Sequence, residues 1–493
     1  MAVDRQYMEG LQPGGSAWWL RKLGAVLDAR RRTLQSPRTM ADYESLYRGD
    51  HPLLFASARF REVFGGLFAE FADNFCGVVV DSLVERLEIQ GFRYADGEVG
   101  KQAGEHAWRV WQSNGMDAES VRGFRETFIK GEANIIVGPG ADPRIPEITV
   151  EDPLQTVVVT TGRQRVVGFK RWFDDETDRL NATLYYSNRV EKYRSQQAAG
   201  WFSTGVDDWI KMVTWEPREV PGEPWPLPHS MGRVPMIPLV NKPDLLGRGE
   251  SELKSVAPLQ GAINKLVLDM MVAAEFSAFR QRWITGIDLP RDPTTGEEVA
   301  PFRPGADSIW TAPPAKVGEQ PTQFGDFEQT DLEPYTKAIE MLIQHVATEQ
   351  RIPIHYLLST NVMPNAESQT AAEAGLVAKA GAKQLDLSDP FEEVNTLVFR
   401  QIGEASWAGL VGGETIWKDR EHRTESQHVD AVAKMAALGV PQEALWEKLG
   451  ASPTTIERWK AMQAAEARRL ASAFDPFAPD EPPDGAVADA PAA

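Results

Sequence analysis

The sequence predicts an α+β fold spread over several domains, and three observations support that class. The chain has 493 residues, more than a single hydrophobic core usually serves. Up to about residue 130 the apolar side chains recur at helical spacing, whereas residues 133–245 form short strand-like runs between Gly, Pro and Asp/Asn clusters. Helical patterns return after residue 250, so helical and strand-rich parts are separate along the chain, as in α+β proteins.

The charge balance limits how the protein can handle nucleic acid. The formal net charge is −19 and the isoelectric point is about 5.0. A protein that grips DNA is usually basic, because each phosphate contact requires Lys or Arg. Any nucleic acid that this chain meets should therefore be held loosely, or by a small local patch.

Cysteine and hydropathy patterns indicate the compartment. The single cysteine, Cys76, lies in an apolar run, which predicts a buried core thiol and excludes an internal disulfide. The N-terminal segment does not resemble a signal peptide, because Arg21 and Lys22 follow directly on residues 18–20. The most apolar stretch, residues 263–279, carries charged side chains and is not expected to span a membrane. These features predict a protein of the reducing cytosol.

Elements in the first half follow from the spacing of apolar residues. Helices are expected over residues 39–47, 52–71, 73–87, 104–114 and 118–131. Their regularly spaced aromatic residues are interpreted as core residues, and these include Trp108, Trp111, Phe124 and Phe128. A mostly antiparallel β region is expected from strands at 134–138, 147–151, 156–160, 166–172, 182–186, 190–194, 210–215 and 236–240.

Two amphipathic helices are predicted after the β region. The first covers residues 253–279, and the second begins near Asp331 and ends before Pro353. Residues 280–330 between them lose helical periodicity and contain seven prolines, which indicates a small module or a functional loop. The apolar stripes of the two helices consist of Leu253, Val256, Ile263, Leu266, Met270, Tyr335, Ile339, Leu342 and Val346.

The last third of the chain is expected to be helical, with capping and breaking residues that mark the helix ends. A polar loop at 359–366 precedes an alanine-rich helix at 371–383 and an apolar helix at 391–402. Three short helices follow, one from a Thr424 cap to Gly439, one from Pro441 to Gly450, and one with Ser452 as N-cap and Pro453 as first residue. From Phe474 onward the Pro-, Ala- and acid-rich composition predicts disorder.

Motifs for catalysis and cofactor binding are not found. There is no P-loop pattern, and Gly247-Arg248-Gly249 is too short for a dinucleotide fingerprint. The seven histidines lack metal-site spacing, and no nucleophile-elbow pattern occurs. We therefore expect no catalytic residue, no metal ligand and no cofactor, and predict that the protein is not an enzyme.

The order of the helices and loops after residue 240 resembles that of portal proteins of tailed bacteriophages, of the siphophage type and particularly of actinobacterial phages. The resemblance is carried by five short blocks in a fixed order, and they read DLLGRGESEL at 244–253, PLQGAINK at 258–265, AFRQRW at 278–283, IPIHYLL at 352–358 with AES at 366–368, and LGVPQEALW at 438–446. It covers nearly the whole chain, apart from the extreme N-terminus and the acidic tail.

This resemblance implies a portal fold, with an α/β wing, a two-helix stem, a small clip insertion and a helical crown, assembled into a ring that is dodecameric in such proteins. The implied parts are a wing at 1–250 (β-rich at 133–245), stem helices at 251–279 and 331–350, a clip at 280–330, a tunnel loop and channel helix at 351–383, a wing helix at 384–415, a crown at 416–472 and a disordered acidic tail at 473–493.

The resemblance also implies a function, namely a channel at one capsid vertex for DNA packaging and ejection. The implied partners are further copies of the chain, the terminase large subunit, scaffold and major capsid protein, the head–tail connector, and double-stranded DNA that passes without sequence specificity, but no membrane. The implied location is the virion, with the host cytoplasm during assembly. Twelve helices, each about 10–12 Å wide, would enclose an opening of about 25–30 Å. We expect the stem stripes to be buried against neighbouring copies.

Candidate site residues follow from the same resemblance. The tunnel loop at the narrowest point would consist of Ser359, Thr360, Asn361, Val362, Met363, Pro364, Asn365 and Ala366. Lys379 and Lys383 lie near it and would either touch the DNA backbone or be ordinary solvated surface charges. Four residues of the clip would either contact partners or pack within the subunit, and these are Arg280, Arg282, Trp283 and Trp310.

Two other classes of function stay open at this point. An enzyme of the packaging apparatus, such as a terminase subunit, is disfavoured by the missing P-loop. A different structural or adaptor protein, including one at a membrane surface, is disfavoured because basic residues do not flank the apolar stripes.

Overall fold

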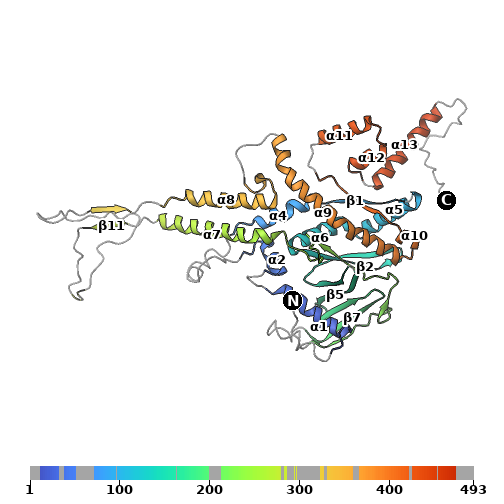
Figure 1. Ribbon diagram of the computed structural model, residues 1–493, viewed down its shortest axis with the longest axis horizontal. Coiled ribbons are helices and arrows are strands. Elements are labelled where there is room, and N and C mark those ends of the chain that lie inside the picture. Colours follow the sequence, from blue (N-terminus) through green and yellow to red (C-terminus); the bar gives the residue numbers. More distant parts are fainter. Residues whose placement is uncertain are drawn as a thin grey trace, which may run out of the picture.

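The computed structural model describes residues 11–32, 38–51, 72–95, 97–162, 164–198, 213–278, 282–285, 294, 296, 323–326, 330–358, 366–420, 425–451 and 453–473. Figure 1 shows a body of helices and sheets from which two helices, α7 (Leu253–Ala278) and α8 (Glu333–Gln350), extend side by side. Within this part of the chain, no helix combines the length and apolar character that a membrane crossing requires.

The N-terminal helices confirm most of the predicted pattern. The helices α2 (Met40–Arg48), α4 (Phe75–Val84), α5 (Gly97–Ser113) and α6 (Met116–Lys130) occupy predicted segments. The side chain of Thr39 caps α2 by accepting from the amide of Asp42, whose carboxylate in turn accepts from the amide of Thr39. The predicted helix at 52–71 lies outside the described residues.

One helix near the N-terminus was missed. Helix α1 (Ser16–Arg31) turns Trp19, Leu20, Leu23 and Leu27 inward, and all four are buried. They cover a six-stranded antiparallel sheet whose main order is β4 (Thr156–Thr161), β5 (Gln164–Asp174), β6 (Arg179–Tyr185), β7 (Arg189–Ala198) and β8 (Trp215–Pro217), with β9 (Leu227–Pro228) also paired to β7. Figure 1 shows α1 against this sheet at the bottom of the body.

The main hydrophobic core lies between the helices and a second sheet. That sheet has the order β10 (Met236–Val240), β2 (Glu132–Asp142) and β3 (Ile145–Glu151), and all its pairs are antiparallel. Trp108, Trp111, Phe124 and Phe128 are buried here, which confirms the prediction that these aromatic residues form core. Cys76 is fully buried in the same core, and burial raises the pKa of its thiol to about 12.

A two-stranded pairing joins distant parts of the chain. Strand β1 (Ile89–Tyr94) pairs antiparallel with β13 (Gly413–Trp417). Neither strand was predicted, and the implied boundary between wing helix and crown at 415/416 falls within β13. Residues 413–417 are therefore part of the body.

Helix α9 (Ala366–Gln401) corrects the predicted pair of helices at 371–383 and 391–402. It is a single element of 36 residues, with Pro390 inside it. Burial on one face continues across the proline, from Leu376 and Leu387 to Phe391 and Leu397. This packing sustains the helix where local propensity alone would end it. The boundary between channel helix and wing helix at 383/384 also falls inside it.

The C-terminal helical unit consists of α11 (Glu425–Ala437), α12 (Gln442–Lys448) and α13 (Pro453–Ala473), which follow the short α10 (Ala405–Ala408) and β13. These three helices confirm the predicted ones, and Pro453 is the first residue of α13 as expected. The predicted caps Thr424 and Ser452, and the tail from Phe474, lie outside the described residues.

Candidate functional site: the paired helices and their base

The pair α7–α8 is anchored in the main core at its base. Leu253, Val256 and Ile263 of α7 and Val346 of α8 are at most 1% exposed and belong to that core. The side-chain amide of Gln350 also donates to the hydroxyl of Ser255 at 2.8 Å, which joins the two helices. The expectation that the stripes are buried against neighbouring copies is thus wrong for this half of the pair, because the subunit's own core covers it.

Farther along the pair, the stripe is less covered. Leu266 and Met270 of α7 and Tyr335, Ile339 and Leu342 of α8 are half-buried. Met341, outside the predicted stripe, is 50% exposed. The part of the apolar stripe that remains available for contacts with other molecules is therefore the outer part of the pair.

A buried ionic cluster lies at the base of the pair, around Glu252, the residue before α7. Its side chain is fully buried, and its carboxylate lies 2.9 Å from the amines of Lys242, Lys379 and Lys383. The side-chain amide of Asn241 also donates to Oε1 of Glu252, at 3.1 Å. We call these residues, together with Gln350, the Glu252 cluster.

The cluster ties together three elements that the sequence places far apart. Lys379 and Lys383 come from α9, and Asn241 and Lys242 follow β10. The amine of Lys379 also donates to Oε1 of Gln350, at the end of α8, at 2.8 Å. Both paired helices and α9 are thus held to the body by one set of charged contacts.

Electrostatics in the cluster favour the ionised carboxylate. Burial alone would raise the pKa of Glu252, but the ammonium groups of Lys379, Lys383 and Lys242 hold it well below its ordinary value. Burial lowers the pKa of Lys379, and Glu252 opposes that shift. Since one carboxylate faces three amines, loss of Glu252 would leave buried positive charge without compensation.

This geometry corrects the prediction for Lys379 and Lys383. Their side chains are 11% and 4% exposed, and both amines point to Glu252. They are therefore neither solvated surface charges nor amines available to a DNA backbone in this structure. Glu252, Asn241 and Gln350 were not recognised from the sequence, because no spacing rule links residues so far apart.

The predicted tunnel loop and most of the predicted clip lie outside the described residues. Positions 359–365 are among these, and Ala366 is the first residue of α9. Arg280 and Trp310 are also outside. Arg282 and Trp283 belong to β11 (Arg282–Thr285), which pairs antiparallel with β12 (Gln323–Asp326). This hairpin follows the far end of the paired helices, which Figure 1 shows at the left.

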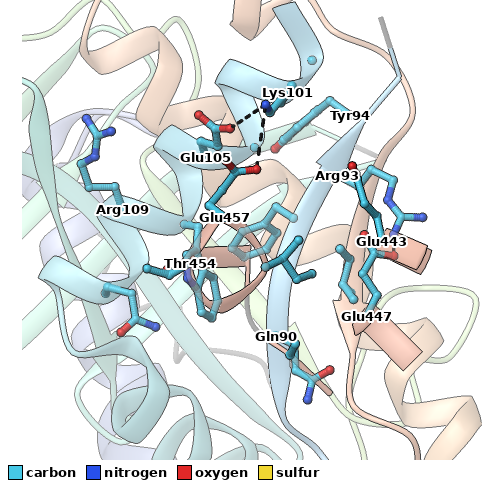
Figure 2. A pocket seen from close by; sticks show the side chains of 18 of the residues that line it. Gln90, Arg93, Tyr94, Lys101, Glu105, Arg109, Glu443, Glu447, Thr454 and Glu457 are labelled. Carbon is cyan, nitrogen blue, oxygen red and sulfur yellow. Dashed lines mark hydrogen bonds and ion pairs between the residues drawn. The ribbon is translucent and has the colours of Figure 1, made fainter. Parts of the chain in front are cut away.

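A cleft of about 790 Å³ separates the C-terminal helical unit from the body. Phe92 and Trp108 are among the residues that line it on the body side. Ion pairs cross it, namely Arg93 with Glu447 and, at 4.0 Å, Lys101 with Glu457. Figure 2 shows Lys101 between Glu105 and Glu457. The charged residues around the cleft are four carboxylates and four cations, so its electrostatics favour neither an anion nor a cation as ligand.

Metal binding has no candidate in the described residues. No group of three or more His, Cys, Asp or Glu side chains lies close enough together there to hold an ion.

The sequence model of the family "Phage portal protein, SPP1 Gp6-like" matches residues 71–469. The match covers most of the chain, and the protein belongs to this family of phage portal proteins.

Two mycobacteriophage proteins are similar in sequence. The portal protein of Mycobacterium phage D29 is 27% identical over 432 residues, and that of Mycobacterium phage L5 is 26% identical over 431 residues. Each alignment covers 82% of this chain and 82% of the relative.

Solved structures of gene transfer agent particles are also similar in shape. A chain of the native virion matches with a TM-score of 0.43 and 11% identity, over 87% of this chain and 98% of that one. A chain from the neck of the empty particle matches with a TM-score of 0.44 and 12% identity, over 85% and 95%. Likenesses this distant add nothing to the family assignment.

Proposed function

We propose that this portal protein forms a ring, with twelve subunits, around a channel through which DNA enters the capsid and leaves it. The family match over residues 71–469 supports this proposal. So does the way in which α7 and α8 extend from the body as a packed pair (Figure 1). Side chains that are only half-buried along the outer part of the pair are suited to contacts between neighbouring subunits.

The channel would be a surface over which DNA slides. A channel that passes every sequence must not bind phosphates strongly, because each neutralised phosphate adds affinity. The net charge of −19 fits this requirement. The two lysines of α9 that could have gripped the backbone are held by Glu252 instead. Residues 359–366 would form the loop at the narrowest point.

The ends of the subunit would meet different partners. The hairpin β11–β12 at the tip of the paired helices would belong to the clip, which docks the terminase large subunit during packaging and the head–tail connector afterwards. Arg280, Arg282, Trp283 and Trp310 would contribute to that surface, since Arg and Trp are favoured interface anchors. The C-terminal helical unit would face the capsid interior, with scaffold and major capsid protein around the ring.

The protein would act as a structural component of the virion that assembles in the host cytoplasm, without catalysis. Electron microscopy of the purified protein tests the central claim. We expect end-on views of a ring with a central hole, in which twelve subunits can be counted. A monodisperse monomer at micromolar concentration would overturn the proposal. An ATPase assay on the same sample, expected to be negative, tests the non-enzymatic role.

A further inference from the structure

Arg86 is a buried guanidinium that the function above does not use. It follows α4, and its side chain is 2% exposed. An arginine is almost never buried to this extent unless acceptors surround its charged group. The acceptors that contact Arg86 therefore identify the segments that this side chain holds together.

Three acceptors from three different segments surround this guanidinium. One terminal nitrogen, Nη1, donates to the backbone carbonyl of Arg420 at 2.9 Å. The other, Nη2, donates to the hydroxyl of Tyr356 at 3.0 Å and lies 3.4 Å from Oε2 of Glu373. The hydroxyl of Tyr356 in turn donates to Oε1 of Glu373 at 3.4 Å, so the contacts form a closed set.

Each acceptor belongs to a different structural segment of the subunit. Tyr356 ends the short helical turn Ile354–Tyr356 that follows α8, and Glu373 lies in the first turns of α9. Arg420 is the last described residue before α11, the first helix of the C-terminal helical unit. Arg86 therefore holds the junction of α8 and α9 to the segment that enters that unit.

The segment around Arg420 is also seated directly on α9. The guanidinium of Arg420 packs over Gly381, where an added Cβ would lie 2.5 Å from Nη1 of Arg420. The side-chain amide of Gln384 donates to the carbonyl of Lys418 at 3.3 Å. Displacement of α9 near Gly381 would therefore move this segment, and with it one acceptor of Arg86.

We propose that Arg86 is a positioning residue that couples the α8–α9 junction to the C-terminal helical unit. A guanidinium presents its donors in a rigid planar fork, so acceptors on that fork keep fixed positions relative to one another. A shift of one acceptor leaves a buried donor unsatisfied unless the other acceptors follow. Movement at the helix junction is thereby passed to the C-terminal unit, and the reverse holds as well.

Hydrogen–deuterium exchange on the full-length protein, in its assembled form, tests this coupling. Tyr356→Phe removes one acceptor, and Gln384→Ala removes the hydrogen bond that holds the carbonyl of Lys418, two residues before another acceptor. We expect Tyr356→Phe to raise exchange in α11 by about threefold or more, and Gln384→Ala to raise it in residues 354–358 to a similar degree. Changes confined to the neighbourhood of each substitution would overturn the proposal.

Two further variants separate coupling from a general loss of structure. Tyr47→Phe is the matched control, because that hydroxyl bonds to Asp81 of α4 at 3.0 Å without contacting Arg86. It should leave exchange in both segments unchanged. Arg86→Lys keeps the charge but cannot reach three acceptors, so it should raise exchange in both segments together. Wild-type exchange at both segments in this lysine variant would also overturn the proposal.

The role of this coupling in a portal ring rests on the proposed function. The exchange experiment measures the coupling itself and does not depend on that function. Failure of the proposed function would appear as the absence of rings in electron microscopy. Failure of the coupling would appear as purely local exchange effects in protein whose assembly is normal.

Discussion

The amine of Lys383 lies 2.9 Å from Oε1 of Glu252, and both side chains are buried. This contact joins α9 to the residue before α7, so it ties the base of the paired helices to α9. The amines of Lys242 and Lys379 also lie 2.9 Å from this carboxylate, and Glu252 is the one anion of the Glu252 cluster.

Substitution of Glu252 is expected to destabilise the fold. Glu252→Gln would leave the buried amines of Lys379 and Lys383 without their counter-charge, at a cost of about 3 kcal/mol or more. Urea unfolding followed by tryptophan fluorescence measures this effect. Glu250→Gln is the control, because that carboxylate is exposed and pairs with the exposed amine of Lys254. It should change stability by less than about 0.5 kcal/mol. Equal stability of the two variants would contradict our account of the cluster.

The stability contributed by Glu252 should depend on pH in one direction. Since the folded-state pKa of Glu252 is held below the ordinary value, its contribution is present above the unfolded pKa of about 4.3. It is lost as pH falls from there toward the folded-state pKa. The stability difference between wild type and Glu252→Gln should therefore be constant near neutral pH and shrink below about pH 4. A difference that grows on acidification would show the opposite linkage.

Gly249 is expected to tolerate no side chain. A Cβ at this position would lie 2.0 Å from the carbonyl oxygen of Gly131, so Gly249→Ala should cost about 1–3 kcal/mol through displaced backbone. Gly138→Ala is the control, because nothing lies within 4 Å of its Cβ position. Thermal melts of the two variants make the comparison. A melting temperature of Gly249→Ala that matches the control would rule out this close approach.

Deletion of residues 359–366 should separate assembly from DNA handling. The proposed function places these residues at the narrowest point of the channel, whereas the outer part of the paired helices would make the contacts between subunits. We expect rings of normal size in electron microscopy, with DNA packaging or retention reduced. Rings that fail to form would argue that these residues belong to the subunit interface.

The sequence was most informative where a local pattern decides the structure. The strand at 236–240 and the helix from Leu253 to Ala278 were predicted almost residue for residue, because alternation and a long apolar stripe are local signals. Helix α9 was predicted as two pieces, an alanine-rich one and an apolar one. Only the burial of residues on both sides of Pro390, such as Leu387 and Phe391, shows that the helix continues.

Long-range pairing was beyond the reach of the sequence. Strands β1 and β13 are short and contain glycine, and each becomes a strand only through the other. Likewise, the position of Lys379 and Lys383 near the predicted tunnel loop suggested contact with DNA. Their partner is Glu252, the residue before α7, more than 120 positions earlier in the sequence. Burial of a charge depends on such distant partners, and no periodicity reports it.

The continuity of α9 limits how the family can change its length. Each residue advances an α-helix by about 100°, so one residue gained or lost between Leu376 and Phe391 would turn every later side chain away from its place in the core. The helix measures about 54 Å, and its stretch from Leu376 to Phe399 packs into the core at fixed azimuths. Sequence drift along it should therefore proceed by substitution, with length variation displaced to the segments outside its ends.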